Sequence, residues 1–255
     1  MAKRKTECTY LNNNAHYGIV LDTEGYSAMP SYNIGFTVVD LQTLQVVEYH
    51  SYAIPEYLEQ NLTYNQEKNQ TKDLSTMYVN NLHDILKGFN SKYNYKTERG
   101  MWLTLQSVIK KYQVRDVFAF NFPFDKSALV RSFGKKAEKL YTLINWHDIQ
   151  TMTFYTYCNN LHYCGWCAMN GYLTENGNIQ TKAETFYRYL FNPEFKEEHT
   201  ALSDVKAETA LLFKALATDR NVKTNHISAW NELKKLMAEN STNPDDLLSE
   251  WLFGE

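Results

Sequence analysis

The stretch 19–25, Ile-Val-Leu-Asp-Thr-Glu-Gly, constrains this chain most, because a short apolar run ends there in two acids separated by one residue. The run predicts a strand over residues 17–24, and successive side chains on a strand point to opposite faces. Asp22 and Glu24 therefore share one face, while Thr23 points to the other. Two like charges on one strand face repel each other unless a cation lies between them, and carboxylate oxygens suit Mg²⁺ or Mn²⁺. Taken alone, however, Asp-x-Glu is a short pattern that equally fits a strand ending in a solvated acidic turn.

Size and charge exclude several classes of protein. The chain has 255 residues, 44% of them hydrophobic, which is enough for one large domain with a core. A net charge of −3 excludes a basic scaffold that grips phosphates through bulk charge, so any contact with nucleic acid must be local. No apolar run approaches the length of a membrane span, and no apolar segment follows the basic residues 3–5 as in a secretory signal. We therefore expect a cytoplasmic protein with reduced cysteines.

The apolar periodicity predicts a layered domain. It indicates strands over 34–40, 46–54, 116–121 and 141–146, and helices over 74–89, 100–112, 125–133, 148–157, 183–191, 200–218 and 227–238. The polar residues 55–75 are expected to form a loop or a weakly structured insertion, and residues 158–180 an irregular segment. Three strands in succession predict an antiparallel meander, and the helices interleaved with later strands predict an α/β or α+β fold. We divide the chain into an N-terminal arm (1–16), a main domain (17–219) with a polar insertion around 55–97, and a C-terminal helical tail (220–255).

Two further acids lie where they could complete a metal site. Asp125 follows a predicted buried strand, and ligands gather at strand ends in layered α/β domains, although an N-cap role explains an Asp there equally well. Asp204 lies in the first turn of the helix over 200–218, where the helix dipole alone would favour an acid. His199 precedes Asp204 by five residues, a step of about 140° on a helix, so we place His199 on the loop that enters the helix. Its neighbours Glu197 and Glu198 are expected to raise its pKa.

The cysteines offer an alternative metal site. Cys158, Cys164 and Cys167, with His162 between them, contain one Cys-x-x-Cys pair. Structural zinc sites usually combine two such ligand pairs, and no second pair is present. The pattern therefore favours ordinary cysteines over a zinc site.

Taken in order, three short motifs resemble those of the DEDDh family of 3′–5′ exonucleases, which have a ribonuclease H-like fold with a mixed central sheet flanked by helices. They are Asp-x-Glu at 22–24, Asn-x-x-Phe-Asp at 121–125 and His-x-x-x-x-Asp at 199–204. Each motif is weak alone, but three in this order and in this predicted structural context are specific. The resemblance covers about residues 17–218. The segments 170–172 and 187–190 are also similar to phage-encoded members of the family.

The resemblance implies hydrolysis of DNA or RNA from the 3′ end, with release of nucleoside 5′-monophosphates by a two-metal mechanism. Two Mg²⁺ or Mn²⁺ ions would be held by four carboxylates: Asp22, Glu24, Asp125 and Asp204. His199 would act as the general base. The expected partner is a single-stranded nucleic acid with a 3′ end. Its binding residues would be Gly25, Tyr26, Asn121 and Phe124.

Two departures from the family pattern concern the substrate. Gly25 and Tyr26 stand where the family usually continues Thr-Thr-Gly, and Phe120 stands where His or Tyr often precedes the Asn. Both leave the acids intact, so they put the choice of substrate in question and not the metal site. Two other functions stay open: a catalytically silent binding module on the same fold, and a different metal-dependent phosphohydrolase.

Overall fold

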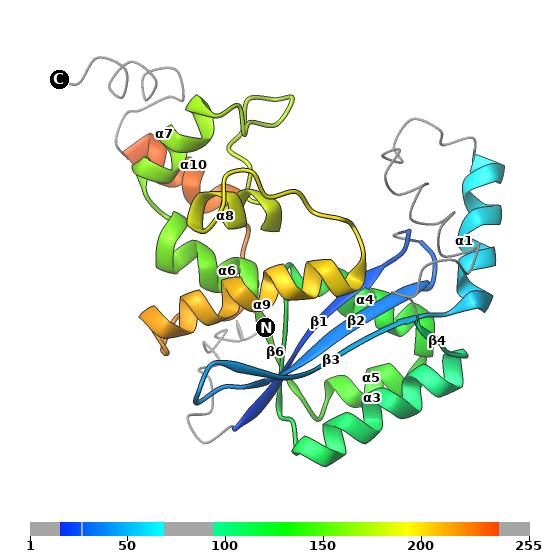
Figure 1. The fold of residues 1–255 in the computed structure, drawn as a ribbon. Helices are drawn as coiled ribbons and strands as arrows, with labels where there is room; N and C mark the ends of the chain where they lie inside the picture. Colours follow the sequence, from blue (N-terminus) through cyan, green and yellow to red (C-terminus); the bar gives the residue numbers. More distant parts are fainter. Residues whose placement is uncertain (1–15, 27, 69–93, 240–255) are drawn as a thin grey trace, which may run out of the picture.

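A six-stranded mixed sheet forms the centre of the protein (Figure 1). The computed structural model describes residues 16–26, 28–68 and 94–239. The strands are β1 (Tyr17–Glu24), β2 (Asn33–Asp40), β3 (Gln45–Ala53), β4 (Asn94–Tyr95), β5 (Asp116–Ala119) and β6 (Asn145–Asp148). Their order across the sheet is β4-β3-β2-β1-β5-β6. The predicted layered domain with a mixed sheet is confirmed.

The pairing of the strands places the end of β1 in the middle of one edge of the sheet. β1, β2 and β3 form the predicted antiparallel meander, in which Asp22 lies opposite Gly35 and Glu24 opposite Asn33. β5 runs parallel to β1, and β6 runs parallel to β5. The carboxyl ends of β1, β5 and β6 therefore meet at one edge, which is where sites form in such sheets.

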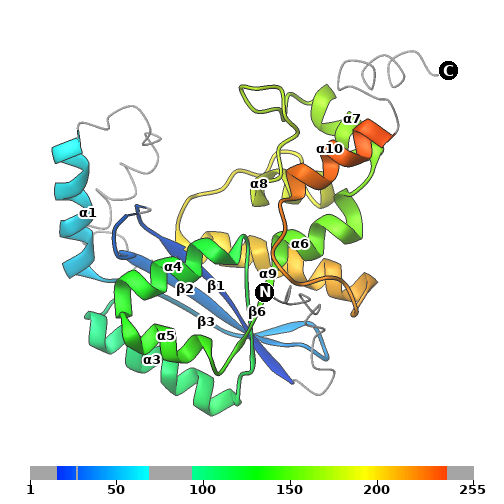
Figure 2. The same ribbon diagram turned by 180° about the vertical axis from the view of Figure 1, so that it is seen from behind.

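Helices cover both faces of the sheet. They are α1 (Pro55–Lys68), α3 (Glu98–Tyr112), α4 (Phe122–Phe133), α5 (Lys135–Tyr141), α6 (Ile149–Thr153), the π-helix η1 (Phe154–Cys158), α7 (Leu161–Met169), α8 (Ala183–Leu190), α9 (Ala201–Thr218) and α10 (Ala229–Glu239). α9 crosses one face beside α6, and α3, α4 and α5 cover the other face, as the two opposite views show (Figures 1 and 2). α7, α8 and α10 extend the α6 side into a lobe beside the sheet.

The alternation along β1 divides the core into two parts. Val20 packs in the cluster that contains the buried face of α9, whereas Ile19 and Leu21 pack in the cluster that contains residues of α3 and α4. By the same alternation, Asp22 and Glu24 follow Val20 toward α9, and Thr23 follows Leu21 toward α4. The two acids that end the strand thus lie under a helix and not in open solvent.

Two segments that we expected to be irregular are helical. α1 occupies the start of the polar stretch 55–75: Pro55 begins it, Tyr57 and Leu58 are buried, and the side chain of Asn61 accepts the backbone N–H of Tyr26. A few anchoring residues thus hold a helix whose composition is mostly polar. α7 lies within 158–180, where the side chain of Asn160 caps it by accepting the N–H of Tyr163.

Other boundaries differ from the predicted ones. α4 begins at Phe122, with Asn121 at the N-cap position but without a capping hydrogen bond from its side chain, so Asp125 lies inside the helix and does not cap it. α5 was not predicted, and β6 covers Asn145–Asp148 in place of 141–146. The predicted helix over 74–89 lies entirely outside the described residues.

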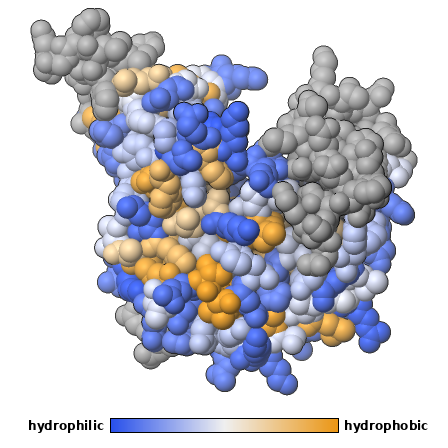
Figure 3. Space-filling model, in the orientation of Figure 1, coloured by the Kyte–Doolittle hydropathy of each residue, from blue (hydrophilic) through white to orange (hydrophobic). Residues whose placement is uncertain are grey.

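The helices of the described residues were compared with the length and hydropathy of a membrane span. No helix there is both long enough and apolar enough to cross a bilayer. On the face seen in Figure 3, hydrophobic residues form patches within a largely hydrophilic surface.

Candidate metal centre

Three carboxylates converge at the end of β1. One ligand oxygen from each of Asp22, Glu24 and Asp204 lies within 4.8 Å of the others. The predicted placement of Asp22 and Glu24 on one strand face is thereby confirmed, and the predicted third acid comes from α9, some 180 residues later in the chain. Three acids this close are the arrangement that a hard divalent cation requires.

The position of Asp204 depends on a close approach between α9 and β2. The side-chain oxygen of Asn33 accepts the backbone N–H of Ala201 at 3.0 Å. A methyl group at Gly35 would lie 2.2 Å from the carbonyl oxygen of Ala201, so only glycine permits this contact. The side chain of Thr200 caps the helix. Together these contacts place the first turn of α9, and with it Asp204, over the end of β1.

Asp125 approaches the same strand end from the other side. Its side chain is buried in the first turn of α4 and accepts a hydrogen bond from the hydroxyl of Thr23 at 2.8 Å. It is outside the group of three carboxylates that lie within 4.8 Å, but it acts electrostatically on Asp22. The structure thus brings Asp125 next to the other acids through Thr23, and its role as a metal ligand stays a prediction.

A fifth acid, Glu208, was missed by the sequence analysis. It lies one helical turn after Asp204, so the two share a face of α9. Its side chain is 5% exposed. The motif that pointed to α9 ends at Asp204, but the spacing of four residues between the two acids was a signal that could have identified Glu208.

Burial and mutual repulsion dominate the electrostatics of these acids. Burial, followed by Glu24 and Glu208, raises the pKa of Asp22 well above its ordinary value. Burial raises the pKa of Asp125 to about 8, and burial together with Glu24 raises that of Asp204 to about 10. The helix dipole, which would lower the pKa of Asp204, is therefore not the dominant effect. The cluster disfavours its own ionisation unless positive charge is supplied.

The donor atoms fit a divalent cation. Within the described residues, Oδ2 of Asp22, Oδ1 of Asp204 and Oε2 of Glu208 are buried and have no hydrogen-bond partner. Buried carboxylate oxygens normally have partners, and these oxygens on neighbouring acids are donors that a divalent cation could bind. A set of oxygen donors selects Mg²⁺ or Mn²⁺ over softer metals. The residues present therefore fit the metals that the motifs imply.

His199 lies on the loop that enters α9, as predicted. Its backbone adopts φ of 50°, which a non-glycine residue adopts only when its surroundings hold it there. Its Nδ1 lies 3.9 Å from a carboxylate oxygen of Glu197. Burial lowers the pKa of His199, so the expected rise is wrong in direction: desolvation outweighs the neighbouring acids. Burial and the carboxylate of Glu184 instead raise the pKa of Glu197 to about 7.

The predicted substrate residues lie just after β1 and at the start of α4. Gly25 follows β1 in a tight turn, where a methyl group would meet the backbone of Ser31 at 3.1 Å. The backbone of Tyr26 is held by Asn61 of α1, and burial raises the pKa of its hydroxyl to about 12. Asn121 has φ of 57° at the start of α4, and the aromatic side chain of Phe124 is 38% exposed. Phe124 thus presents an accessible aromatic surface in the same helical turn as Asp125.

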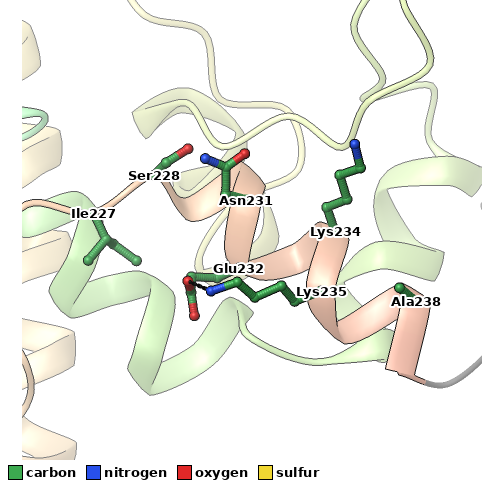
Figure 4. A pocket seen from close by; sticks show the side chains of 7 residues that line it. All are labelled: Ile227, Ser228, Asn231, Glu232, Lys234, Lys235 and Ala238. Atoms are coloured by element: carbon green, nitrogen blue, oxygen red, sulfur yellow. Dashed lines mark hydrogen bonds and ion pairs between the residues drawn. The ribbon is translucent and has the colours of Figure 1, made fainter.

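Two other candidate sites lie apart from the acids. Cys158, Cys164 and Cys167 are free thiols buried in the apolar core, and burial raises the pKa of each. The only cluster of potential metal ligands within the described part of the chain is the acidic one, which leaves the zinc alternative without support. A cavity of about 620 Å³ lies along α10, where Glu232 and Lys235 form an ion pair (Figure 4). None of its lining residues belongs to the acidic site.

Comparison with solved structures identifies the fold. The structure is similar to a full-length 3′-exonuclease, with a TM-score of 0.50 and 10% identity over 85% of this chain and 89% of the other. It is also similar to a 3′-exonuclease solved in a study of 3′-end recognition of a histone mRNA stem-loop (TM-score 0.49, 11% identity, 83% of this chain and 86% of the other). A third is the nuclease domain of 3′hExo, a DEDDh family member bound to rAMP (TM-score 0.48, 11% identity, 85% and 99%). No protein-family model matches the sequence, and no curated protein matches it significantly.

The fold is thus the ribonuclease H-like fold of 3′-exonucleases, as the motifs predict. At 10% identity the likeness establishes the fold and not the activity. The argument for function therefore depends on the site.

Proposed function

We propose that this protein is a metal-dependent 3′–5′ exonuclease of the DEDDh type, whose catalytic domain spans residues 17–219. One observation carries the proposal: carboxylates from two distant segments, Asp22 and Glu24 on β1 and Asp204 on α9, converge within 4.8 Å. The fold shared with a 3′-exonuclease and the order of the three motifs support the same function.

The acids would hold divalent cations, and each would do so from a rigid element. Asp22 and Glu24 end a central strand, Asp125 lies in the first turn of α4, and Asp204 lies in the first turn of α9. Bound Mg²⁺ or Mn²⁺ would supply Lewis-acid polarisation of the phosphodiester and lower the pKa of water. The net negative charge of the chain then suits a phosphate substrate, because the cations offset the charge of the phosphate.

His199 would accept the proton of the attacking water. Its pKa is lowered by burial, so the imidazole is neutral near pH 7 and able to act as a base. Nδ1 lies 3.9 Å from the carboxylate of Glu197, so a hydrogen on Nδ1 would leave Nε2 to take the proton. The water oxygen forms a bond to phosphorus, the bond from phosphorus to the 3′ oxygen of the penultimate nucleotide breaks, and a nucleoside 5′-monophosphate leaves.

Tyr26, just after β1, and Phe124, at the start of α4, would contact the terminal nucleotide. Aromatic side chains stack on bases of any sequence, which suits a single-stranded 3′ end. Because the side chain of Asn61 holds the backbone of Tyr26, helix α1, which was not expected from the sequence, would help to position the substrate.

The test is a degradation assay on single-stranded and duplex DNA and RNA, labelled at the 3′ or the 5′ end, with Mg²⁺, with Mn²⁺ and with EDTA. We expect release of labelled 5′-monophosphate from 3′-labelled substrates and a progressive shortening of 5′-labelled ones, only with metal. Binding without degradation would identify a silent binding module, and hydrolysis of a small phosphoester alone would identify a different phosphohydrolase.

A further inference from the structure

Glu208 faces the acidic site from inside the protein. It lies on the buried face of α9, four residues after Asp204, and α9 packs across β1 and β2. Its carboxylate acts on Asp22 more strongly than Asp125 or Asp204 does, and the charges that act on Glu208 itself come from Asp125, Asp204 and Glu197. Glu208 lies outside the group of three carboxylates within 4.8 Å, as Asp125 does, and is their electrostatic neighbour from the buried face of α9.

The surroundings of Glu208 do not provide for its charge. The side chain is 5% exposed, and its Oε2 is buried without a hydrogen-bond partner in the described part of the chain. The backbone of Phe120 stabilises the carboxylate, but the adjoining side chains that act on it are acids. If Glu208 only linked α9 to the end of β5, its hydrogen bond with the backbone of Phe120 would be sufficient, and a glutamine could make the same bond.

We propose that Glu208 is a fifth carboxylate of the metal centre, which contributes from the α9 side of Asp22 and raises the affinity for a divalent cation before nucleic acid binds. This inference rests on the metal-dependent function proposed for the same site. It goes beyond the three motifs, which contain no acid at this position. Its consequence is a centre that holds its cation through protein ligands and depends less on substrate phosphate for this purpose.

The experiment compares Mn²⁺ binding to the full chain and to Glu208→Gln by isothermal titration calorimetry, with thermal unfolding in EDTA and in Mn²⁺. Glutamine preserves the shape and the contact with Phe120 and removes only the charge. We expect the Mn²⁺ affinity to fall at least tenfold and the Mn²⁺-induced rise in Tm to shrink, while the Tm in EDTA stays the same or rises. Unchanged Mn²⁺ affinity with an unchanged Tm shift would overturn the proposal.

The matched control is Asp116→Asn. Asp116 is as deeply buried but is paired with His147 outside the acidic site. This substitution should lower the Tm in EDTA and leave the Mn²⁺ affinity unchanged. If Asp116→Asn weakened Mn²⁺ binding as much as Glu208→Gln does, the effect at Glu208 would be a general consequence of removing a buried acid, and the proposal would fail.

A double variant provides a second test of the proposal. If Glu208 and Asp22 act on the same cation, Asp22→Asn combined with Glu208→Gln should lose little more Mn²⁺ affinity than Asp22→Asn alone. Two fully additive losses would overturn the proposal. Loss of Mn²⁺ affinity in Glu208→Gln, with no degradation by the wild type, would contradict the exonuclease function and leave this inference standing. Degradation by the wild type, with unchanged Mn²⁺ affinity in Glu208→Gln, would support the exonuclease function and contradict this inference.

Discussion

Two acids on neighbouring parallel strands, Asp116 fully buried and Asp22 half-buried, have opposite surroundings. Asp116, at the start of β5, is fully buried, and its Oδ1 accepts hydrogen bonds from His147 at 2.7 Å and from Asn145 at 3.1 Å. Asp22, near the end of β1, has Glu24 and Glu208 as its strongest electrostatic neighbours. Oδ2 is buried without a partner in the described residues in both acids, so the difference lies in the groups around the rest of each carboxylate. The carboxylate of Asp116 is compensated by hydrogen-bond donors of the fold, whereas that of Asp22 would be compensated only by a bound cation.

This difference separates a structural acid from a functional one. A buried charge with a partner contributes to a unique fold, and losing the partner is costly. A buried group of like charges lowers stability and persists only where the rest of the structure holds it. The contrast between Asp116 and Asp22 can therefore be tested by removing each charge in turn and following stability and activity separately.

The largest expected effect is on activity. Asp22→Asn should abolish metal-dependent release of mononucleotides, because it removes a ligand at the centre of the cluster. The same change should leave the Tm in EDTA unchanged or raise it, since it removes repulsion. Asp116→Asn should do the opposite: unfolding becomes easier by about 1–3 kcal/mol, because the buried His147 loses its carboxylate partner, while activity at 25 °C persists. Degradation assays and thermal unfolding of both variants check the contrast, and a metal-dependent activity retained by Asp22→Asn would refute the assignment of the site.

His199→Ala should lower the rate of degradation by about 10²–10⁴-fold, the usual contribution of a general base, with little change in Mn²⁺ affinity. The pH profile of the wild type provides the second measurement. Because burial lowers the pKa of His199 below its ordinary value of 6.5, the base stays neutral as the pH falls to 6.5. The activity should decline only below that pH, and a decline that begins above pH 7 would contradict the role of His199.

Sequence reasoning identified the parts of this site that depend on local pattern. Asp22 and Glu24 share a face because strands alternate, and the step of five residues placed His199 outside the helix that carries Asp204. Sequence reasoning failed where contacts between distant segments determine the structure. The φ of 57° at Asn121, which moves the start of α4 ahead of Asp125, has no local signature in the sequence. The pKa of His199 follows its burial and not its neighbours in sequence. The spacing of Asp204 and Glu208 indicates a shared face of α9, but the packing of α9 on β1 is what brings that face to the other acids.

The contact between α9 and β2 offers a test at an uncharged position. Gly35→Ala would place a methyl group 2.2 Å from the carbonyl oxygen of Ala201, so the start of α9 must shift and carry Asp204 away from β1. We expect a loss of stability of about 1–3 kcal/mol, as for other overpacked positions, together with weaker Mn²⁺ binding. Gly18→Ala is the matched control, because its methyl group would meet the ring of Phe118 at 2.9 Å, far along β1 from the acids. It should cost stability but not Mn²⁺ affinity, and equal Mn²⁺ affinity in both variants would show that α9 does not position Asp204 through this contact.

The smallest expected effect is a pH dependence of stability that metal removes. The pKa of Asp125 is raised to about 8 and that of Asp204 to about 10 in the folded protein, against about 3.8 for an Asp in the unfolded chain. Between those values the folded state binds more protons than the unfolded state, so the free energy of unfolding falls as pH rises. The stability that these acids contribute is fully present below about pH 4 and is progressively lost up to about pH 8–10.

In EDTA the Tm should therefore decline from pH 5 to pH 9, and saturating Mn²⁺ should flatten the decline because it compensates the ionised carboxylates. The variant Asp22→Asn, with one charge fewer, should show a shallower decline in EDTA, whereas Asp116→Asn should have a lower Tm than the wild type. A wild-type Tm that rises toward pH 9 in EDTA would mean that the acids are compensated within the fold, as Asp116 is, and the distinction between the two acids would be lost.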